Sequence, residues 1–512
     1  MGPPTIKKLA MIGCGSMGGG MALLFAENGL EVSLQDPSKE AMDALKKSAE
    51  KQGLGEKTEE YTDYQSLCAS LDSPKLIVFS LPHGDVGDTV LGGLLPYLEK
   101  DDIILDCGNE RWTNTERRQS KCVTRGIEYI GCGVSGGYQA ARAGPSMCPG
   151  GSDEGLDTVL PLLKKVAAKD KEGKSCVGKV GTGGCGHYVK MVHNGIEHGM
   201  MSAISEAWKI LVTGAGLPLE EVGDIFENWD QSGHLSGTFL VSIGASISRT
   251  IDPSTGERVV LTVEDKVVQD ITGEEGTGIW SNVEAIEHHI PAPTMATAHF
   301  LRLASADRQQ RVDAQKAFGG EISQQKIDFK SSEDKSEFVE SLRVAVFAAC
   351  LASYIQGINV IERADKENGW NVDFAAVHQI WKAGCIIQSD YISELLSPIF
   401  TLSLEEVSST STSKAHTRNL LLQPHIMSLL REAYPHLRRI VAKATEKDWC
   451  VPALSATLEY IKYQTGTDLP TGFYEAELDF FGKHMFDRKG AEGSNELRTG
   501  AEHFEWKPAM GS

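Results

Sequence analysis

The sequence has no apolar run long enough to span a membrane, no Cys-x-x-Cys pair and a deficit of basic residues. Its apolar runs fall short of the roughly 18–20 residues of a membrane span, and its first residues form no signal-peptide pattern. The eleven cysteines are scattered and show no metal-ligand spacing, which indicates reduced thiols in a cytoplasmic protein. We therefore expect no membrane association and no metal site.

The charge balance is strongly acidic. Fifty Lys and Arg residues face seventy Asp and Glu residues, which gives a net charge of −20. The negative electrostatic potential of such a protein repels nucleic acid and anionic membranes, so we expect neither as a partner. An anionic small molecule would have to be bound by local positive charge.

A Rossmann-type α/β unit is predicted at the N-terminus. An apolar strand at 6–12 leads into a Gly-x-Gly-x-x-Gly loop, an apolar helix from Met21 and a second strand at 31–35. Glycines in this order allow a tight turn, an approach of the pyrophosphate to the backbone, and close packing of helix on strand. The predicted cofactor-binding residues of this loop are Gly13, Gly15, Ser16, Met17 and Gly18.

Asp36 follows the second strand and bears on the choice of cofactor. A carboxylate there accepts hydrogen bonds from ribose hydroxyls and repels a 2′-phosphate, which favours NAD, with NADP as the alternative. The other interpretation is that Asp36 only opens an Asp-Pro-Ser turn.

Three further strands are predicted at 76–81, 103–106 and 127–131, alternating with helical stretches as in a doubly wound sheet. The loops that follow two of them, at 82–84 and 107–109, are expected to line the nicotinamide cleft. Asn109 is the candidate cofactor contact in the second loop.

A glycine cluster at 181–186 precedes a long predicted helix that continues to about Thr213. At about 100° per residue, five polar side chains share one face within about 140°: Lys190, His193, Asn194, Glu197 and His198. A soluble helix often turns such a face to water. Small apolar neighbours and Gly195, which we expect to interrupt the helix, favour instead a buried site with a lysine base.

These motifs resemble 6-phosphogluconate dehydrogenases. The likeness runs in order from about residue 6 to about 490 and includes 190–197, Gly133-Val134-Ser135-Gly136-Gly137, Gly276-Thr277-Gly278 with Trp280, Arg302, 384–387, and Phe481-Gly482 with His484. A Ser/Thr-rich stretch at 403–415 departs from the family in length, as a surface insertion would.

The resemblance implies an oxidative decarboxylation of a β-hydroxy acid. Lys190 would take the hydroxyl proton, hydride would pass to the nicotinamide, and Glu197 would protonate the carbon left after loss of CO₂. His193 and Asn194 complete the catalytic set. The implied substrate-binding residues are Ser135, Gly136, Gly137, Asn194, His198, Thr277, Arg302 and His484.

The family's phosphate-binding pattern is broken. In the family, a Lys, a Tyr and two Arg residues bind the substrate phosphate. At the matching positions this chain has Glu275 in place of the Lys, His198 in place of the Tyr and Leu478 in place of one Arg. The other Arg is retained as Arg302. Tyr138 and Gln139 replace two acidic residues, and an Arg302–Glu275 pair is expected. We predict a β-hydroxy sugar acid without the terminal phosphate. The alternatives are 6-phosphogluconate itself and a non-catalytic paralogue with a binding role.

The domain boundaries follow from the helical character after the glycine cluster. We predict a dinucleotide-binding Rossmann domain at 1–184, an all-helical domain at 185–467 with amphipathic segments such as 335–361, and a C-terminal tail at 468–512. The resemblance implies a homodimer in which the tail enters the partner's site and brings His484 with it. The tail itself is polar and Gly-rich, as expected of a segment that does not fold alone.

Overall fold

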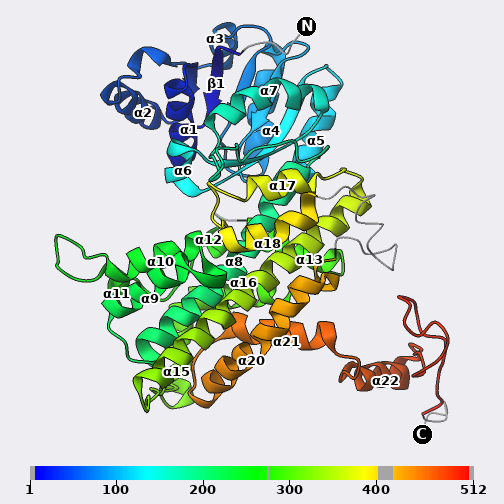
Figure 1. Cartoon of the computed structure of the whole chain (residues 1–512). Coiled ribbons are helices and arrows are strands. Elements are labelled where there is room, and N and C mark those ends of the chain that lie inside the picture. Colours follow the sequence, from blue (N-terminus) through cyan, green and yellow to red (C-terminus); the bar gives the residue numbers. More distant parts are fainter. Residues whose placement is uncertain (1–5, 274–275, 402–418, 507–512) are drawn as a thin grey trace. The chain divides into compact units, whose positions relative to one another are not determined.

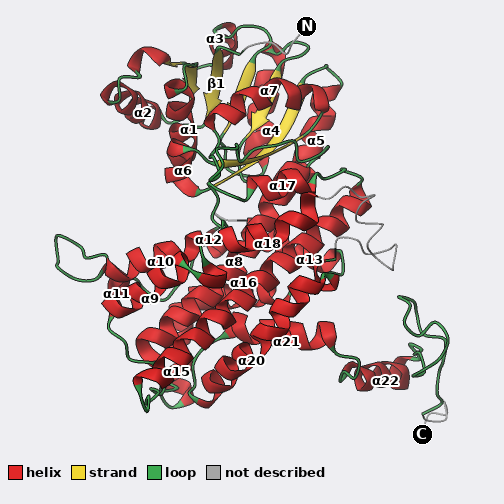
Figure 2. Ribbon diagram, viewed as in Figure 1, coloured by secondary structure: helices red, strands yellow, loops and turns green. Residues whose placement is uncertain are grey.

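The computed structural model describes residues 6–273, 276–401 and 419–506 (Figure 1). The chain forms two units, residues 1–458 and 459–512. In the first unit, a β-sheet region is followed by helices, as Figure 2 shows. The predicted fold class, a Rossmann-type domain followed by a large all-α region, is confirmed.

Seven strands form one sheet in the order β3-β2-β1-β4-β5-β6-β7. All neighbouring pairs are parallel except β6 and β7. The strands are β1 (Lys8–Ile12), β2 (Glu31–Gln35), β3 (Thr58–Glu60), β4 (Leu76–Phe79), β5 (Ile103–Asp106), β6 (Glu128–Ser135) and β7 (Ser146–Gly150). The predicted strands correspond to β1, β2, β4, β5 and β6. The two edge strands, β3 and β7, were not predicted.

Helices cover both faces of the sheet because its strands are apolar on both sides. Leu9 and Met11 pack into one core with α1 and α7, whereas Ala10 and Ile12 pack into a second core on the opposite face. The helices of this region are α1 (Ser16–Glu27), α2 (Lys39–Lys51), α3 (Tyr64–Ala69), α4 (Asp85–Leu94), α5 (Trp112–Val123), α6 (Gly137–Ala143) and α7 (Asp153–Val166). The strand order reverses between β1 and β4, which is where doubly wound folds bind ligands.

From Cys185 onward the described chain is helical. Its helices are α8 (Cys185–Lys209), α9 (Leu219–Gln231), α10 (Phe239–Arg249), α11 (Val259–Thr262), α12 (Gln269–Thr272), α13 (Thr277–Glu287), α14 (Pro293–Ala306), α15 (Arg308–Phe318), α16 (Ser332–Asn368), α17 (Phe374–Ile380), α18 (Asp390–Thr401), α20 (Pro424–Glu446) and α21 (Pro452–Thr465). The long helix predicted after the glycine cluster is α8, which continues into a π-helical turn at Ile210–Gly214. It contacts β6, β7, α13, α14 and α16.

The long helix α16 differs from the expected amphipathic segment. Its side chains are buried on all sides over most of Phe338–Ala364. By length and composition α16 could cross a membrane, but 94% of its most apolar window is buried inside the fold. An all-round apolar helix of this kind is typical of a protein core.

The second unit, 459–512, contains the end of α21 and the helix α22 (Thr471–Gly482). The carboxylate of Asp479 organises the chain that follows α22. It accepts hydrogen bonds from His503 Nδ1 (2.9 Å), Trp506 Nε1 (2.8 Å) and the backbone N–H groups of Phe504 and Met485 (both 3.1 Å). The tail is thus tied to its own helix by one buried acid.

Candidate active site

The glycine-rich loop joins β1 to α1, as predicted. Gly13 has φ +97°, and a Cβ there would lie 2.1 Å from the carbonyl oxygen of Ser80. A Cβ on Gly18 would lie 2.0 Å from the oxygen of Gly13, so helix and strand touch at this point. A Cβ on Gly15 would meet no atom within 4 Å. The loop therefore leaves open space in front of the N-terminus of α1, where Ser16 and Met17 begin the helix, and this space fits a pyrophosphate.

Asp36 lies at the end of β2 and is held by backbone groups. It accepts hydrogen bonds from the N–H of Cys14 (2.7 Å) and from the N–H of Ser38 (2.8 Å). The Asp-Pro-Ser turn of the alternative interpretation is therefore present. The same bonds fix the carboxylate beside the glycine-rich loop, where a ribose would lie.

A buried arginine that sequence reasoning missed connects the two loops expected at the nicotinamide cleft. Arg118 donates to the carbonyl oxygen of Gly84 (2.6 Å) and to Glu110 (2.8 Å), and lies 3.0 Å from Asp88. Glu110 in turn accepts from the N–H of Gly84 (3.1 Å). The exposed Asn109 directly precedes Glu110. Arg118 thus connects both loops. No sequence motif near residue 118 predicts these contacts.

The helix α8 lies directly against the last parallel strand of the sheet. A Cβ on Gly133 of β6 would lie 2.1 Å from Cβ of Lys190, and one on Gly186 would lie 2.2 Å from the oxygen of Gly131. The glycines therefore let the helix approach the strand closely. As a result, the side chain of Lys190 is buried where the two regions of the first unit meet.

Four predicted residues form a continuous hydrogen-bond network. The carboxamide oxygen of Asn194 accepts hydrogen bonds from Lys190 and from His193 Nδ1 (3.1 Å). His193 Nε2 lies 3.1 Å from the Ser135 hydroxyl, and its Nδ1 lies 3.8 Å from a Glu197 oxygen. Burial and the nearby Lys190 lower the pKa of His193 well below its usual value, which keeps the ring neutral. The polar face of the helix is thus buried and does not face water.

The amide nitrogen of Asn194 donates to the hydroxyl of Thr277 at 2.7 Å. This bond joins α8 to the start of α13. The expectation that Gly195 interrupts the helix was wrong, because α8 is continuous. Gly195 instead lets two neighbours approach: a Cβ there would lie 2.5 Å from Met295 Cε and 2.8 Å from Ser281 Oγ.

Gly136 and Gly137 follow Ser135 and adopt positive φ angles of 112° and 69° at the start of α6. A Cβ on Gly136 would lie 2.5 Å from the oxygen of Gly384, so this turn is packed against a distant loop. Tyr138 is exposed next to it. This turn directly follows Ser135 at the end of β6.

Arg302 pairs with Asp270, a partner that was not predicted. Its Nε donates to Asp270 at 2.5 Å, and its Nη1 lies 3.0 Å from His198 Nε2. The expected partner Glu275 lies outside the described residues, so that pair stays a prediction. Sequence reasoning missed Asp270 because nothing in a four-residue helix 32 positions away indicates the contact.

The predicted substrate residue His484 and Leu478, which stands where the family has an Arg, lie in the second unit. His484 packs against Phe481 at 6.0 Å between ring centroids, and Leu478 belongs to α22. The substrate contact of His484 stays a prediction. Among the described residues no group of His, Cys, Asp and Glu side chains could hold a metal ion.

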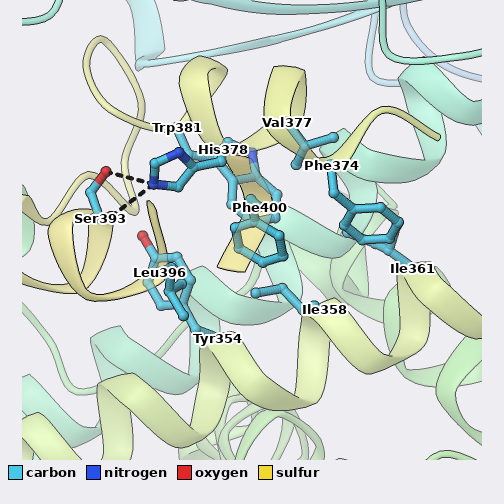
Figure 3. Close-up of a pocket in the computed structure, with 10 residues that line it drawn as sticks. All are labelled: Tyr354, Ile358, Ile361, Phe374, Val377, His378, Trp381, Ser393, Leu396 and Phe400. Atoms are coloured by element: carbon cyan, nitrogen blue, oxygen red, sulfur yellow. Dashed lines mark hydrogen bonds between the residues drawn. The ribbon is translucent and has the colours of Figure 1, made fainter. Parts of the chain in front are cut away.

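An apolar pocket is lined by side chains of α16, α17 and α18 (Figure 3). Trp381 lines this pocket, and its ring lies 6.4 Å from that of His193. The cavity volume is only about 10 Å³, which is room for one water at most. The pocket is therefore too small for a substrate, and its side chains belong to the packing around His193.

Two family profiles cover nearly the whole chain. The NAD binding domain of 6-phosphogluconate dehydrogenase matches residues 8–181, and the 6-phosphogluconate dehydrogenase C-terminal domain matches residues 186–506. This chain belongs to the 6-phosphogluconate dehydrogenase family. It is therefore an NAD(P)-dependent oxidoreductase of the hydroxy-acid class.

Full-length relatives agree with this assignment. The decarboxylating 6-phosphogluconate dehydrogenase of Emericella nidulans is 42% identical over 96% of this chain and 100% of its own length. Decarboxylating 6-phosphogluconate dehydrogenase 2 of Arabidopsis thaliana is 34% identical over 98% of this chain and 97% of its own. The structure of 6-phosphogluconate dehydrogenase from Plasmodium falciparum matches with a TM-score of 0.84 at 30% identity, covering 98% of this chain and 100% of that one.

Proposed function

We propose that this enzyme oxidises and decarboxylates a β-hydroxy sugar acid that lacks a terminal phosphate. The observation that carries the proposal is the pairing of Arg302 with the buried Asp270, beside a neutral His198. A phosphate dianion draws its affinity from cations that are not already neutralised. Arg302 and Asp270 together carry no net charge, so this end of the pocket suits an uncharged group.

The hydroxy-acid end has the groups that the reaction needs. The nicotinamide, when bound, accepts the hydride from the hydroxyl-bearing carbon. Lys190 takes the hydroxyl proton, so that a ketone forms, and then returns a proton to the ketone oxygen as the C–C bond to the carboxylate breaks. CO₂ leaves with its oxygens, the electron pair passes to the enediol, and Glu197 protonates the enediol carbon.

The contacts of the network support these roles. The hydrogen bond from Lys190 to Asn194 orients the amine, and His193 and Ser135 belong to the same hydrogen-bond network. We assign the backbone amides of Gly136 and Gly137, which follow Ser135, to the binding of the substrate carboxylate and its neighbouring hydroxyls. We assign Arg302, Thr277 and His198 to the other end of the substrate, and His484 of the exchanged tail completes the proposed set.

A second candidate substrate is 6-phosphogluconate itself. The names of the relatives favour it, since two decarboxylating 6-phosphogluconate dehydrogenases match 96% and 98% of this chain. The deciding experiment measures initial rates of NADH and NADPH formation with 6-phosphogluconate and, separately, with gluconate. Fast turnover of the phosphorylated acid at micromolar concentration would contradict our proposal. The third alternative, a paralogue without catalysis, is excluded by turnover of any hydroxy acid.

For the cofactor we propose NAD ahead of NADP. The Asp36 carboxylate, fixed by Cys14 and Ser38, occupies the position where a 2′-phosphate would be repelled. Gly13, Gly15, Gly18, Ser16 and Met17 would hold the pyrophosphate, and Asn109 the nicotinamide side. The Plasmodium falciparum relative is described in complex with NADP+, so both cofactors belong in the first assay.

We also propose the predicted division into a dinucleotide-binding domain at 1–184, a helical domain at 185–467 and a tail at 468–512. The first of these breaks coincides with the start of α8 at Cys185. A cytoplasmic homodimer with exchanged tails fits the exposed aromatic side chains of the second unit, among them Phe473, Tyr474 and Phe481. Sedimentation of the full chain and of a chain ending at 467 tests the dimer.

A further inference from the structure

A buried histidine lies one helical turn before Lys190 and has no part in the proposed chemistry. This residue, His187 of α8, is 1% exposed. It packs against β6, where a Cβ on Gly131 would lie 2.8 Å from its Nδ1, so the ring has little room to move. Residues three apart on a helix lie on one face, about 4.5 Å apart along the axis. A displacement of His187 therefore displaces Lys190.

His187 makes two hydrogen bonds to the sheet region. Its Nε2 lies 3.1 Å from the backbone oxygen of Asp106 at the end of β5, and its Nδ1 lies 2.7 Å from the hydroxyl of Thr115 on α5. A carbonyl oxygen only accepts, so Nε2 carries a proton. Burial lowers the pKa of His187, which favours the neutral ring. Its Nδ1 therefore accepts from Thr115.

Asp106 is the residue from which the loop at 107–109 begins, and this loop is expected to line the nicotinamide cleft. The carboxylate of Asp106 accepts hydrogen bonds from the N–H of Gly108 (3.1 Å) and from the hydroxyl of Tyr129 (2.6 Å). The first turn of the loop is thus fixed to Asp106. Through the backbone oxygen of the same residue, His187 connects the loop directly to α8.

Two side chains of α5 hold the turn that precedes α8. The carboxylate of Glu116 accepts from the N–H of Gly184 (3.1 Å), and the side-chain amide of Gln119 donates to the oxygen of Gly183 (2.9 Å). These bonds fix where the helix begins. The bonds of His187 lie within the helix itself, so they also fix its rotation relative to the cofactor loop.

We propose that His187 is a positioning residue that sets the place of the Lys190 amine relative to the nicotinamide. Its bond to Asp106 fixes the helix that carries the proposed base against the loop that lines the nicotinamide cleft. A misplacement of about 1 Å between reacting groups can cost about a hundredfold in rate. The inference rests on the proposed function, to which the roles of Lys190 and of the loop belong.

Two variants separate the bond to Asp106 from the bond to Thr115. His187→Gln keeps an N–H donor near the position of Nε2, whereas His187→Asn keeps only an acceptor near the position of Nδ1. The substrate is gluconate or 6-phosphogluconate, whichever the wild type oxidises. We expect kcat to fall about a hundredfold in His187→Asn and less than about tenfold in His187→Gln, with KM of the acid within about threefold. His436→Asn, at a contact between α20 and α16, is the control and should keep the wild-type kcat.

Dinucleotide binding tests the same link without a hydroxy acid. NADH reaches the loop at 107–109, whereas ADP-ribose has no nicotinamide. We expect His187→Asn to weaken NADH binding about fivefold or more and ADP-ribose binding less than about twofold, because only the nicotinamide end is displaced. NADPH and 2′-phospho-ADP-ribose replace this pair if the wild type binds NADPH more tightly. Quenching of protein fluorescence measures both constants.

The outcomes separate this inference from the proposed function. Wild-type kcat in His187→Asn, or equal losses of NADH and ADP-ribose affinity, would overturn the role of His187 and leave the proposed function standing. Turnover of 6-phosphogluconate alone would overturn the proposed substrate but not the role of His187. A wild type that oxidises neither acid would reject the proposed function, and the two binding constants then decide the inference. If His187→Asn fails to fold, a hundredfold loss of kcat in His187→Gln still contradicts it, because that variant keeps the donor.

Discussion

The side-chain amide of Asn194 donates to the hydroxyl of Thr277 at 2.7 Å and thereby ties α8 to α13. The oxygen of the same amide accepts from Lys190 and His193. Because an amide has one oxygen and one nitrogen, the bond to Thr277 dictates which end faces Lys190. Thr277 therefore orients the proposed base without touching it.

Thr277→Val should lower kcat/KM of the hydroxy-acid reaction roughly ten- to a hundredfold, since it leaves a buried amide N–H unpaired and lets Asn194 turn. The binding of the dinucleotide, followed by quenching of protein fluorescence, should not change. Thr277→Ser keeps the hydroxyl and is the control. A valine variant whose rate stays within twofold of the wild type would show that Thr277 does not orient Asn194.

The sequence predicted the elements whose signal is local. The strands at 31–35 and 103–106 coincide with β2 and β5, because short apolar runs between turn residues carry their own pattern. The edge strand β7 was missed because its sequence, Ser-Met-Cys-Pro-Gly, contains a proline and gives no strand signal. Its pairing with β6 is set by the sheet.

The network around Lys190 was predictable for the same reason, since three of its four members, Lys190, His193 and Asn194, share one helix face. Partners brought in from other elements were not. Arg302 and His198 lie 104 residues apart, and the choice of Asp270 as the ion-pair partner depends on how α12 and α14 pack. The sequence around Arg118 likewise does not predict its contacts with Asp88, Asp106 and Glu110. Such contacts exist only in the folded chain.

Arg118→Met should destabilise the protein by about 3–5 kcal/mol, because the buried Glu110 and Asp106 lose their cation. It should also weaken dinucleotide binding, since Gly84 and Glu110 are no longer held together. Arg117→Met is a matched control: Arg117 also pairs with Asp88 but is half exposed, and its loss should cost under about 0.5 kcal/mol. Equal urea midpoints for the two variants would contradict this prediction.

Asp36→Asn should move the cofactor preference toward NADP, because the charge that repels a 2′-phosphate is removed while an acceptor for a backbone N–H remains. The ratio of kcat/KM for NAD to that for NADP should fall about tenfold or more. Asp43→Asn, which removes an exposed partner of Lys39 on α2, should leave the ratio as it is. If Asp36→Asn also leaves this ratio unchanged, then Asp36 does not select the cofactor and only stabilises the Asp-Pro-Ser turn.

Glu206 should make stability depend on pH. Burial raises its pKa from 4.5 to about 7, although the N–H groups of Ala453 and Leu454 donate to its carboxylate. Folding therefore favours the protonated acid, so its contribution to stability is present below about pH 4.5 and is lost as the pH rises through about 7. The loss amounts to about 2–4 kcal/mol.

Glu206→Gln should abolish that contribution, because glutamine does not titrate in this range. Urea unfolding at pH 5 and pH 7.5 measures it as the change in unfolding free energy, wild type against variant. We expect the wild type to lose more stability than the variant between these pH values. Parallel changes in both proteins would mean that the buried carboxyl keeps its usual pKa.

Asp270→Asn should convert Arg302 into an anion-binding side chain. In the wild type the guanidinium donates to Asp270 at 2.5 Å, so the pair has no net charge; the asparagine keeps an acceptor and leaves the positive charge uncompensated. Inorganic phosphate, as an inhibitor competitive with the hydroxy acid, should bind about tenfold more tightly to this variant. Asp265→Asn is the control, since it removes an exposed partner of Arg308 and Arg311. An unchanged inhibition constant in a folded Asp270→Asn protein would show that the ion pair does not decide against phosphate.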